Sequence, residues 1–103
     1  MNAESENSSI ARLRRLVPEI ERRGVARVWA FGSRAAGRAR ADSDWDVLVE
    51  FKPDEPPTFD RFMGLKLFLE EELGAKVDLL SWTACKERFL AAIQDELVPL
   101  HAS

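Results

Sequence analysis

The apolar residues of this chain change their spacing repeatedly, and this change constrains the fold more than any other feature of the sequence. Between residues 10 and 20 they recur every three or four positions, which is typical of an amphipathic helix, and this spacing returns between residues 62 and 73. Short apolar runs, typical of buried strands, lie at residues 25–31, 45–51 and 76–80. Strands separated by helices in so short a chain predict one small sheet with helices packed on it.

Capping and turn residues set the expected ends of these elements. The candidates are Ser8 or Ser9 and then Gly24 for the first helix, and Thr58 or Asp60 and then Gly74 for the second. A last helix is predicted from Thr83 to about Leu97. We therefore expect a mixed α+β fold, an α/β arrangement in which about four helices pack on a mixed sheet of three or four strands.

The length of 103 residues predicts one domain over residues 8–100, preceded by a disordered polar tail over residues 1–7. No apolar run approaches the roughly 20 residues that a membrane span needs, and no secretory signal is evident. We therefore expect a cytoplasmic protein that has no contact with membranes. The single cysteine, Cys85, has no internal partner for a disulfide and is expected to be packed or half-exposed.

Charge is distributed unevenly along the chain. Residues 1–40 carry nine arginines and four acids, whereas the remainder carries six basic residues and fourteen acids. So acidic a second part argues against stable binding to nucleic acid, which requires a broad basic face. It favours a site in which carboxylates hold metal ions and arginines meet phosphates.

Gly32 and Ser33 follow the first predicted strand at a sharp turn. Backbone amides in such a turn can approach a phosphate closely because glycine has no side chain, and Ser33 adds a hydroxyl donor. A short helix that begins near Arg34 would direct its N-terminus at that phosphate. Arg34 itself has two interpretations: its guanidinium binds a phosphate, or it pairs with Asp42 or with an acid of a partner.

Asp44 and Asp46 stand two residues apart at the start of the second predicted strand, so both carboxylates face the same side. Adjacent carboxylates repel each other unless a divalent cation neutralises them, and their hard oxygen ligands favour magnesium over zinc. Asp78 is a third carboxylate, in an otherwise apolar strand. The alternative interpretation is that the first two are turn residues and that Asp78 is an edge-strand acid in water.

The order of these residues resembles that of the DNA polymerase β-type nucleotidyltransferases: Gly32-Ser33, Gly37, Asp44-x-Asp46 and then Asp78. More narrowly, the Gly-Ser-Arg-x-x-Gly form resembles the minimal nucleotidyltransferases that act as antitoxins beside HEPN toxins. The resemblance implies a nucleotidyltransferase fold and an enzyme that uses ATP and two Mg²⁺ ions. It implies metal binding by Asp44, Asp46 and Asp78, which are then the catalytic residues, and nucleotide binding by Gly32 and Ser33, with Arg34 as a further candidate.

The resemblance also implies a function: transfer of AMP from ATP onto a tyrosine of a cognate HEPN toxin, in a hetero-oligomer with that toxin. Because no sequence is left for an acceptor-binding domain, we expect the acceptor to bring its own surface. Two alternatives stay open. The chain could be a binding module that neutralises its partner by covering it, or the catalytic subunit of an enzyme that modifies a small molecule of the aminoglycoside type.

Overall fold

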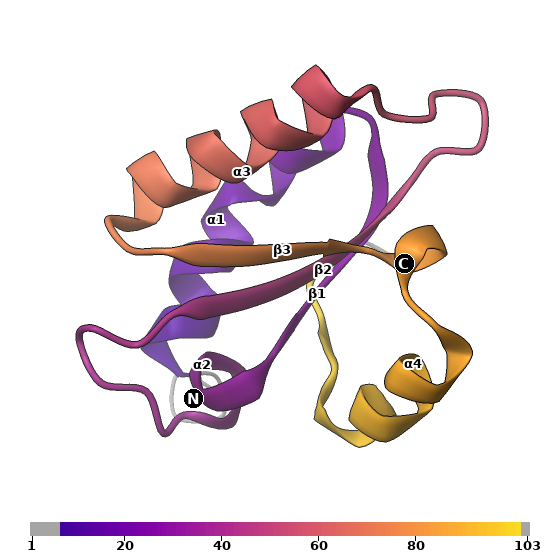
Figure 1. Ribbon diagram of the computed structural model, residues 1–103. Helices are drawn as coiled ribbons and strands as arrows, with labels where there is room; N and C mark the ends of the chain where they lie inside the picture. The colour runs from indigo at the N-terminus through magenta and orange to yellow at the C-terminus, as the bar shows by residue number, and fades with distance from the viewer. Residues whose placement is uncertain (1–6, 102–103) are drawn as a thin grey trace.

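The computed structural model describes residues 7–101, in which four strands form one mixed sheet (Figure 1). The elements are α1 (Ser8–Arg22), β1 (Val25–Phe31), α2 (Gly32–Ala36), β2 (Trp45–Phe51), α3 (Phe59–Leu73), β3 (Val77–Ser81), η2 (Trp82–Ala84), α4 (Glu87–Ile93), η3 (Gln94–Glu96) and β4 (Val98–Pro99). The strand order is β3-β2-β1-β4, in which β1 runs antiparallel to β2 and β4 while β2 and β3 are parallel. The predicted mixed α+β class and the mixed sheet are confirmed.

α1 begins one residue earlier than its predicted caps allow. The cap is Asn7, whose side-chain oxygen accepts a hydrogen bond from the Ile10 N–H at 2.8 Å, so the assignment of Ser8 or Ser9 was wrong. The Asn7 amide nitrogen also donates to the carbonyls of Arg34 and Ala35 at 3.0 and 3.2 Å. An amide side chain accepts and donates at once, so Asn7 can cap α1 and also fasten it to α2. The rest of the predicted tail lies outside the described residues.

One face of the sheet carries the larger core. α1 and α3 lie on this face, as Figure 1 shows, and bury aliphatic side chains of both helices against the strands. Ile10, Leu13, Leu65 and Leu69 are examples at 4% exposure or less. Trp45 belongs to the same core at 1% exposure. This packing supplies most of the apolar burial that holds the sheet.

The opposite face is covered only in part. Trp29, Phe31, Leu48 and Ile93 form a smaller cluster there beneath α4, and Trp82 packs at its margin. Cys85 is half-buried in the same cluster, as expected, and its burial raises the pKa of the thiol. The part of this face nearest the β1–α2 turn is left to polar side chains.

The predicted helix from Thr83 to Leu97 was wrong. The segment consists of η2, a seven-residue α4, η3 and the short strand β4. β4 pairs with β1, and beyond it the Leu100 N–H donates to the Val28 carbonyl at 2.8 Å. Because the chain must return to the sheet edge beside β1, it leaves the helical conformation at Leu97, although its apolar spacing stays compatible with a helix.

The other boundaries lie close to their predicted places. β1 and β2 span the predicted residues, β3 is shifted by one residue, and Thr58 caps α3 by accepting from the Arg61 N–H at 3.1 Å. Within residues 7–101, no helix has the length and hydrophobicity needed to cross a bilayer.

Candidate active site

The turn at Gly32 brings the two halves of the sequence motif into contact. Gly32 has φ +76°, which glycine adopts readily, and it leads from β1 directly into the five-residue helix α2. A Cβ atom at this position would lie only 2.2 Å from Oδ2 of Asp46. The side chain of Asp46 therefore occupies the space that the glycine leaves free, and no other residue type fits there without moving the carboxylate.

Asp46 and Asp78 lie opposite each other on the parallel strands β2 and β3. The alternation along each strand puts their neighbours Val47 and Leu79 into the core beneath α1 and α3. Both carboxylates therefore face the other side of the sheet. Asp44 is exposed and comes immediately before the first residue of β2, so it belongs to the loop and not to the strand.

Asp46 is the carboxylate most perturbed by this arrangement. Partial burial has the largest effect on its pKa, followed by the negative charges of Asp78, Asp44 and Glu96 and a side-chain hydrogen bond with Asp78; all of them raise the pKa. The structure thus brings Asp46 together with both other predicted acids, and each of them disfavours its charged form. A positive charge in the site would reverse that preference.

The donor set fits a hard divalent cation. It consists of carboxylate oxygens that repel one another, which is the ligand chemistry that Mg²⁺ prefers and Zn²⁺ does not. Over the described range 7–101, however, no three acidic, histidine or cysteine side chains already lie close enough to enclose a metal ion. Mutual repulsion disfavours closer approach of the acids when no cation neutralises them. Asp44 and Asp78 are exposed, so the cation has access from solvent.

Ser33 and Arg34 follow Gly32 in α2 but differ in environment. Ser33 is half-buried, and its carbonyl accepts from the Arg38 N–H at 3.0 Å, which closes the turn behind the helix. Arg34 is only 8% exposed. Its guanidinium donates to the carbonyls of Ala41 and Ser43 at 3.3 and 2.8 Å, so it contacts the loop that contains Asp42 through backbone atoms.

Sequence reasoning missed the acidic rim that the end of the chain supplies. Glu96, from η3, adds a negative charge near Asp46, and it lines a cavity of about 400 Å³ together with Gly32, Ala36 and Arg38. The long helix predicted from Thr83 to Leu97 gave no reason to expect Glu96 close to Asp46. The available signal was the pair Asp95-Glu96 just before an apolar strand-like run, but nothing in its spacing points to β1 as the neighbour.

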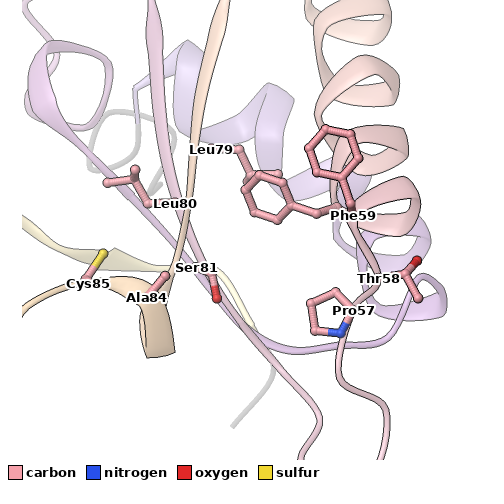
Figure 2. Close-up of a pocket in the computed structure, with 9 residues that line it drawn as sticks. Pro57, Thr58, Phe59, Leu79, Leu80, Ser81, Ala84 and Cys85 are labelled. Atoms are coloured by element: carbon pink, nitrogen blue, oxygen red, sulfur yellow. The ribbon is translucent and has the colours of Figure 1, made fainter.

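A second cavity, of about 440 Å³, is mostly apolar (Figure 2). It opens between the start of α3, at Pro57 and Phe59, and the segment at Leu80, Ala84 and Cys85. None of its lining residues is one of the predicted site residues. Its polar side chains, Thr58, Ser81 and Cys85, include no carboxylate, so a site for a divalent cation is expected around Asp46 and not in this cavity.

Comparison with known proteins identifies the family of the chain. The model of the nucleotidyltransferase domain family matches residues 11–100. A protein adenylyltransferase, MntA of Thermococcus cleftensis, is 38% identical over 78 residues, which cover 76% of this chain and 77% of the relative. A solved structure of a proposed minimal nucleotidyltransferase superposes with a TM-score of 0.75 at 39% identity. The match covers 86% of this chain and 89% of the chain in that structure.

A more distant structure shares the fold alone. It is a tri-AMPylated HEPN toxin of Shewanella oneidensis in complex with an MNT antitoxin, and the matching chain has a TM-score of 0.70 at 13% identity. The match covers 92% of this chain and 73% of that one. The chain belongs to the nucleotidyltransferase domain family, since the family model spans most of it.

Proposed function

We propose that the protein transfers AMP from ATP onto a partner protein in a Mg²⁺-dependent reaction, and that it acts in this way as the antitoxin of a HEPN-type toxin. The contact between Gly32 and Asp46 carries this proposal, because it joins the phosphate-binding turn to the carboxylates. The adenylyltransferase relative and the toxin–antitoxin neighbour support the choice of AMP and of a HEPN partner. A stable complex with that partner follows from the same reasoning.

Each residue has a role that its position allows. The first N–H groups of α2, at Gly32 and Ser33, have no partner within the helix and are available to the phosphates of the nucleotide. Asp44, Asp46 and Asp78 would hold Mg²⁺, which when bound stabilises the charge on the attacking and leaving oxygens. Their electrostatic coupling through Asp46 supports a shared cation.

The transfer forms one bond and breaks another. A hydroxyl oxygen of the acceptor attacks the α-phosphorus of ATP, pyrophosphate leaves, and the acceptor carries AMP as a phosphodiester. The Asp78 carboxylate, which is exposed, would take the proton of that hydroxyl. A tyrosine is the proposed acceptor, and it must arrive from solvent over the part of the sheet that α4 leaves open.

Mass spectrometry of the acceptor tests the proposal. The purified protein and a cognate HEPN toxin are incubated with ATP and Mg²⁺, and the mass of the toxin is expected to rise by one or more AMP groups. The Asp46→Asn variant serves as the control, because it removes a charge from the site and keeps the shape of the side chain. It is expected to leave the toxin mass unchanged.

The covering-module alternative makes a different forecast. An inhibitor that acts by occlusion needs neither ATP nor Asp46, and it must stay bound to silence the toxin. After the reaction the two proteins are separated and the toxin is assayed alone. Lasting inactivity with added mass supports the enzyme, whereas recovered activity at the original mass would refute the transfer. Modification of an aminoglycoside but of no protein would favour the small-molecule alternative.

A further inference from the structure

The side chain of Arg34 makes an unusual set of internal contacts for an arginine beside a nucleotide site. Its exposure is 8%, and its guanidinium carbon lies 4.4 Å from the centre of the buried Trp45 ring. One terminal nitrogen donates to the carbonyls of Ser43 and Ala41, and the other donates to the Ser9 hydroxyl at 3.3 Å. The guanidinium thus links α1, α2 and the loop before β2.

These contacts leave little of Arg34 for a ligand. Both terminal nitrogens already have partners, and Nε is buried with no hydrogen-bond partner anywhere in the described part of the chain. A phosphate that bound the terminal nitrogen nearest the loop would have to displace the Ser43 and Ala41 carbonyls, at a cost comparable to the hydrogen bonds gained. The geometry therefore disfavours the phosphate contact that the sequence suggested for this residue.

The loop that Arg34 holds connects the two halves of the active site. It runs from the end of α2 to Asp44, and it is closed on itself where the Ser43 hydroxyl accepts from the Arg40 N–H at 2.8 Å and the Ser43 N–H donates to the Arg40 carbonyl at 3.0 Å. On the far side, the Trp45 N–H donates to the Lys76 carbonyl at 2.9 Å, which fixes the start of β2 against β3. Asp44 lies between Ser43 and Trp45, two of the residues that Arg34 contacts.

We propose that Arg34 is a positioning residue that fixes residues 38–44 and thereby places Asp44 beside Asp46, without contacting the nucleotide. Its guanidinium suits this task because it is flat, carries several donors in a fixed geometry and stacks on an aromatic ring. The catalytic consequence rests on the proposed function. The bracing of the loop does not, so the two can be tested separately.

Two substitutions separate the positioning role from phosphate binding. Arg34→Lys keeps the positive charge, which is enough for much of a phosphate contact, but one ammonium cannot reach both carbonyls and lie flat on Trp45. Arg34→Met keeps the apolar stem and removes every donor. Arg40→Ala is the matched control, because Arg40 is an exposed arginine of the same loop and contributes only backbone atoms to the closure of that loop.

Three readouts are measured for all variants: amide hydrogen exchange of residues 38–44, the ratio of ATP affinity to AMP affinity, and the rate of AMP transfer. We expect exchange in the loop to rise at least about tenfold in both Arg34 variants, because hydrogen bonds from a charged donor are lost. The affinity ratio should fall no further than in an Asp44→Asn variant, since a misplaced Asp44 weakens the metal-dependent part of ATP binding while no contact from Arg34 to the outer phosphates is lost. Transfer should fall about a hundredfold, as expected for misplaced catalytic groups. Arg40→Ala should match the wild type.

A lysine variant with normal loop exchange and normal transfer would overturn the proposal, and so would a loss of ATP affinity in the methionine variant that exceeds the loss in Asp44→Asn. If the wild type transfers AMP to no acceptor, the proposed function fails, while loop exchange still decides the role of Arg34. If neither variant folds, nitrogen-15 NMR of the wild type decides. Slowly exchanging Arg34 guanidinium protons that do not shift on addition of ATP and Mg²⁺ support bracing, and protons that become ordered only with nucleotide refute it.

Discussion

The two faces of the sheet are built from the same strands, yet they have opposite properties. Beneath α1 and α3 the strands bury aliphatic residues such as Val28, Val47 and Val77, all at 0% exposure. On the other face the same strands carry Asp46 and Asp78 beside a small aromatic cluster. Alternation along a strand thus lets one residue stabilise the fold while its neighbour carries the chemistry.

Stability and chemistry are therefore separable in this small domain. Partial burial and the neighbouring negative charges raise the pKa of Asp46, so its ionised form disfavours the folded state, and the opposite face compensates through apolar burial. Variants of the acidic face should lose activity and keep their stability. Variants of the helical face should show the reverse.

The largest effect is expected at Asp78. Asp78→Asn removes a proposed metal ligand and proton acceptor, and metal stabilisation worth several kcal/mol corresponds to a loss of transfer of about a thousandfold or more. The measurement is the initial rate of AMP incorporation, and Asp54→Asn, at an exposed loop acid, is the control that should keep the parent rate. Comparable rates for the two variants would remove Asp78 from the mechanism.

The helical face is tested with a pair of leucines on α3. Leu69 is fully buried, so Leu69→Ala should lower the free energy of unfolding by about 2–5 kcal/mol. Leu67 is 58% exposed, and Leu67→Ala should change the free energy of unfolding by less than about 0.5 kcal/mol. Urea titration measures both values. Transfer rates at a temperature where both variants are folded should match the parent rate, and a strong loss of rate in Leu69→Ala alone would show that the faces are coupled.

A pair of glycines tests the contact between the turn and Asp46. Gly32 and Gly74 have similar backbone conformations, with φ +76° and +66°, so an alanine is strained at both, at a cost of about 1–3 kcal/mol. Only at Gly32 would the added methyl group collide with Asp46, because no atom lies within 4 Å at Gly74. We expect Gly32→Ala alone to lose nucleotide binding in a calorimetric titration. Equal nucleotide affinity of the two variants would mean that the contact between Gly32 and Asp46 does not affect nucleotide binding.

The smallest effect is a pH dependence of stability in the absence of metal. The pKa of Asp46 is raised in the folded protein above its ordinary value of 3.8, so the folded state holds this proton to higher pH than the unfolded state does. Ionisation of Asp46 therefore lowers stability as the pH rises from about that value through the raised pKa.

The amide that Asp46→Asn introduces cannot ionise, so chelator-treated wild type and variant should be close in stability below this pH window. The variant should be increasingly the more stable of the two above the window, and Mg²⁺ should reduce the difference. Thermal melts of both proteins across the pH range measure this difference in stability. A difference that does not depend on pH would contradict the cause assigned to the shift.

The strands and most of the site could be predicted because their signals are local. The apolar runs at residues 25–31 and 45–51 are bounded by residues that cannot continue a strand, and the observed strands have the same bounds. Alternation along each strand predicts that Asp46 and Asp78 point away from the core, but the adjacency of β2 and β3 and their parallel register were missing from the sequence. The metal and nucleotide roles of the site residues stay predictions.

The remaining features depend on contacts between segments that are distant in sequence. Asn7 caps α1 because it also binds the carbonyls of Arg34 and Ala35, and no local pattern distinguishes it from Ser8. The predicted helix after Thr83 is broken because β4 must pair with β1. The bracing contacts of Arg34 likewise exist only once the loop before β2 has folded back over α2.

The central claim is that the turn at Gly32 and the three aspartates form one metal-dependent nucleotide site. Isothermal titration of ATP into the wild type, once with excess Mg²⁺ and once with chelator, tests it most directly. The triphosphate would otherwise meet carboxylates of the same sign, so we expect binding in Mg²⁺ and a large loss of affinity in chelator, with no such difference for Asp46→Asn. Equal ATP affinity of the wild type under both conditions would contradict the claim.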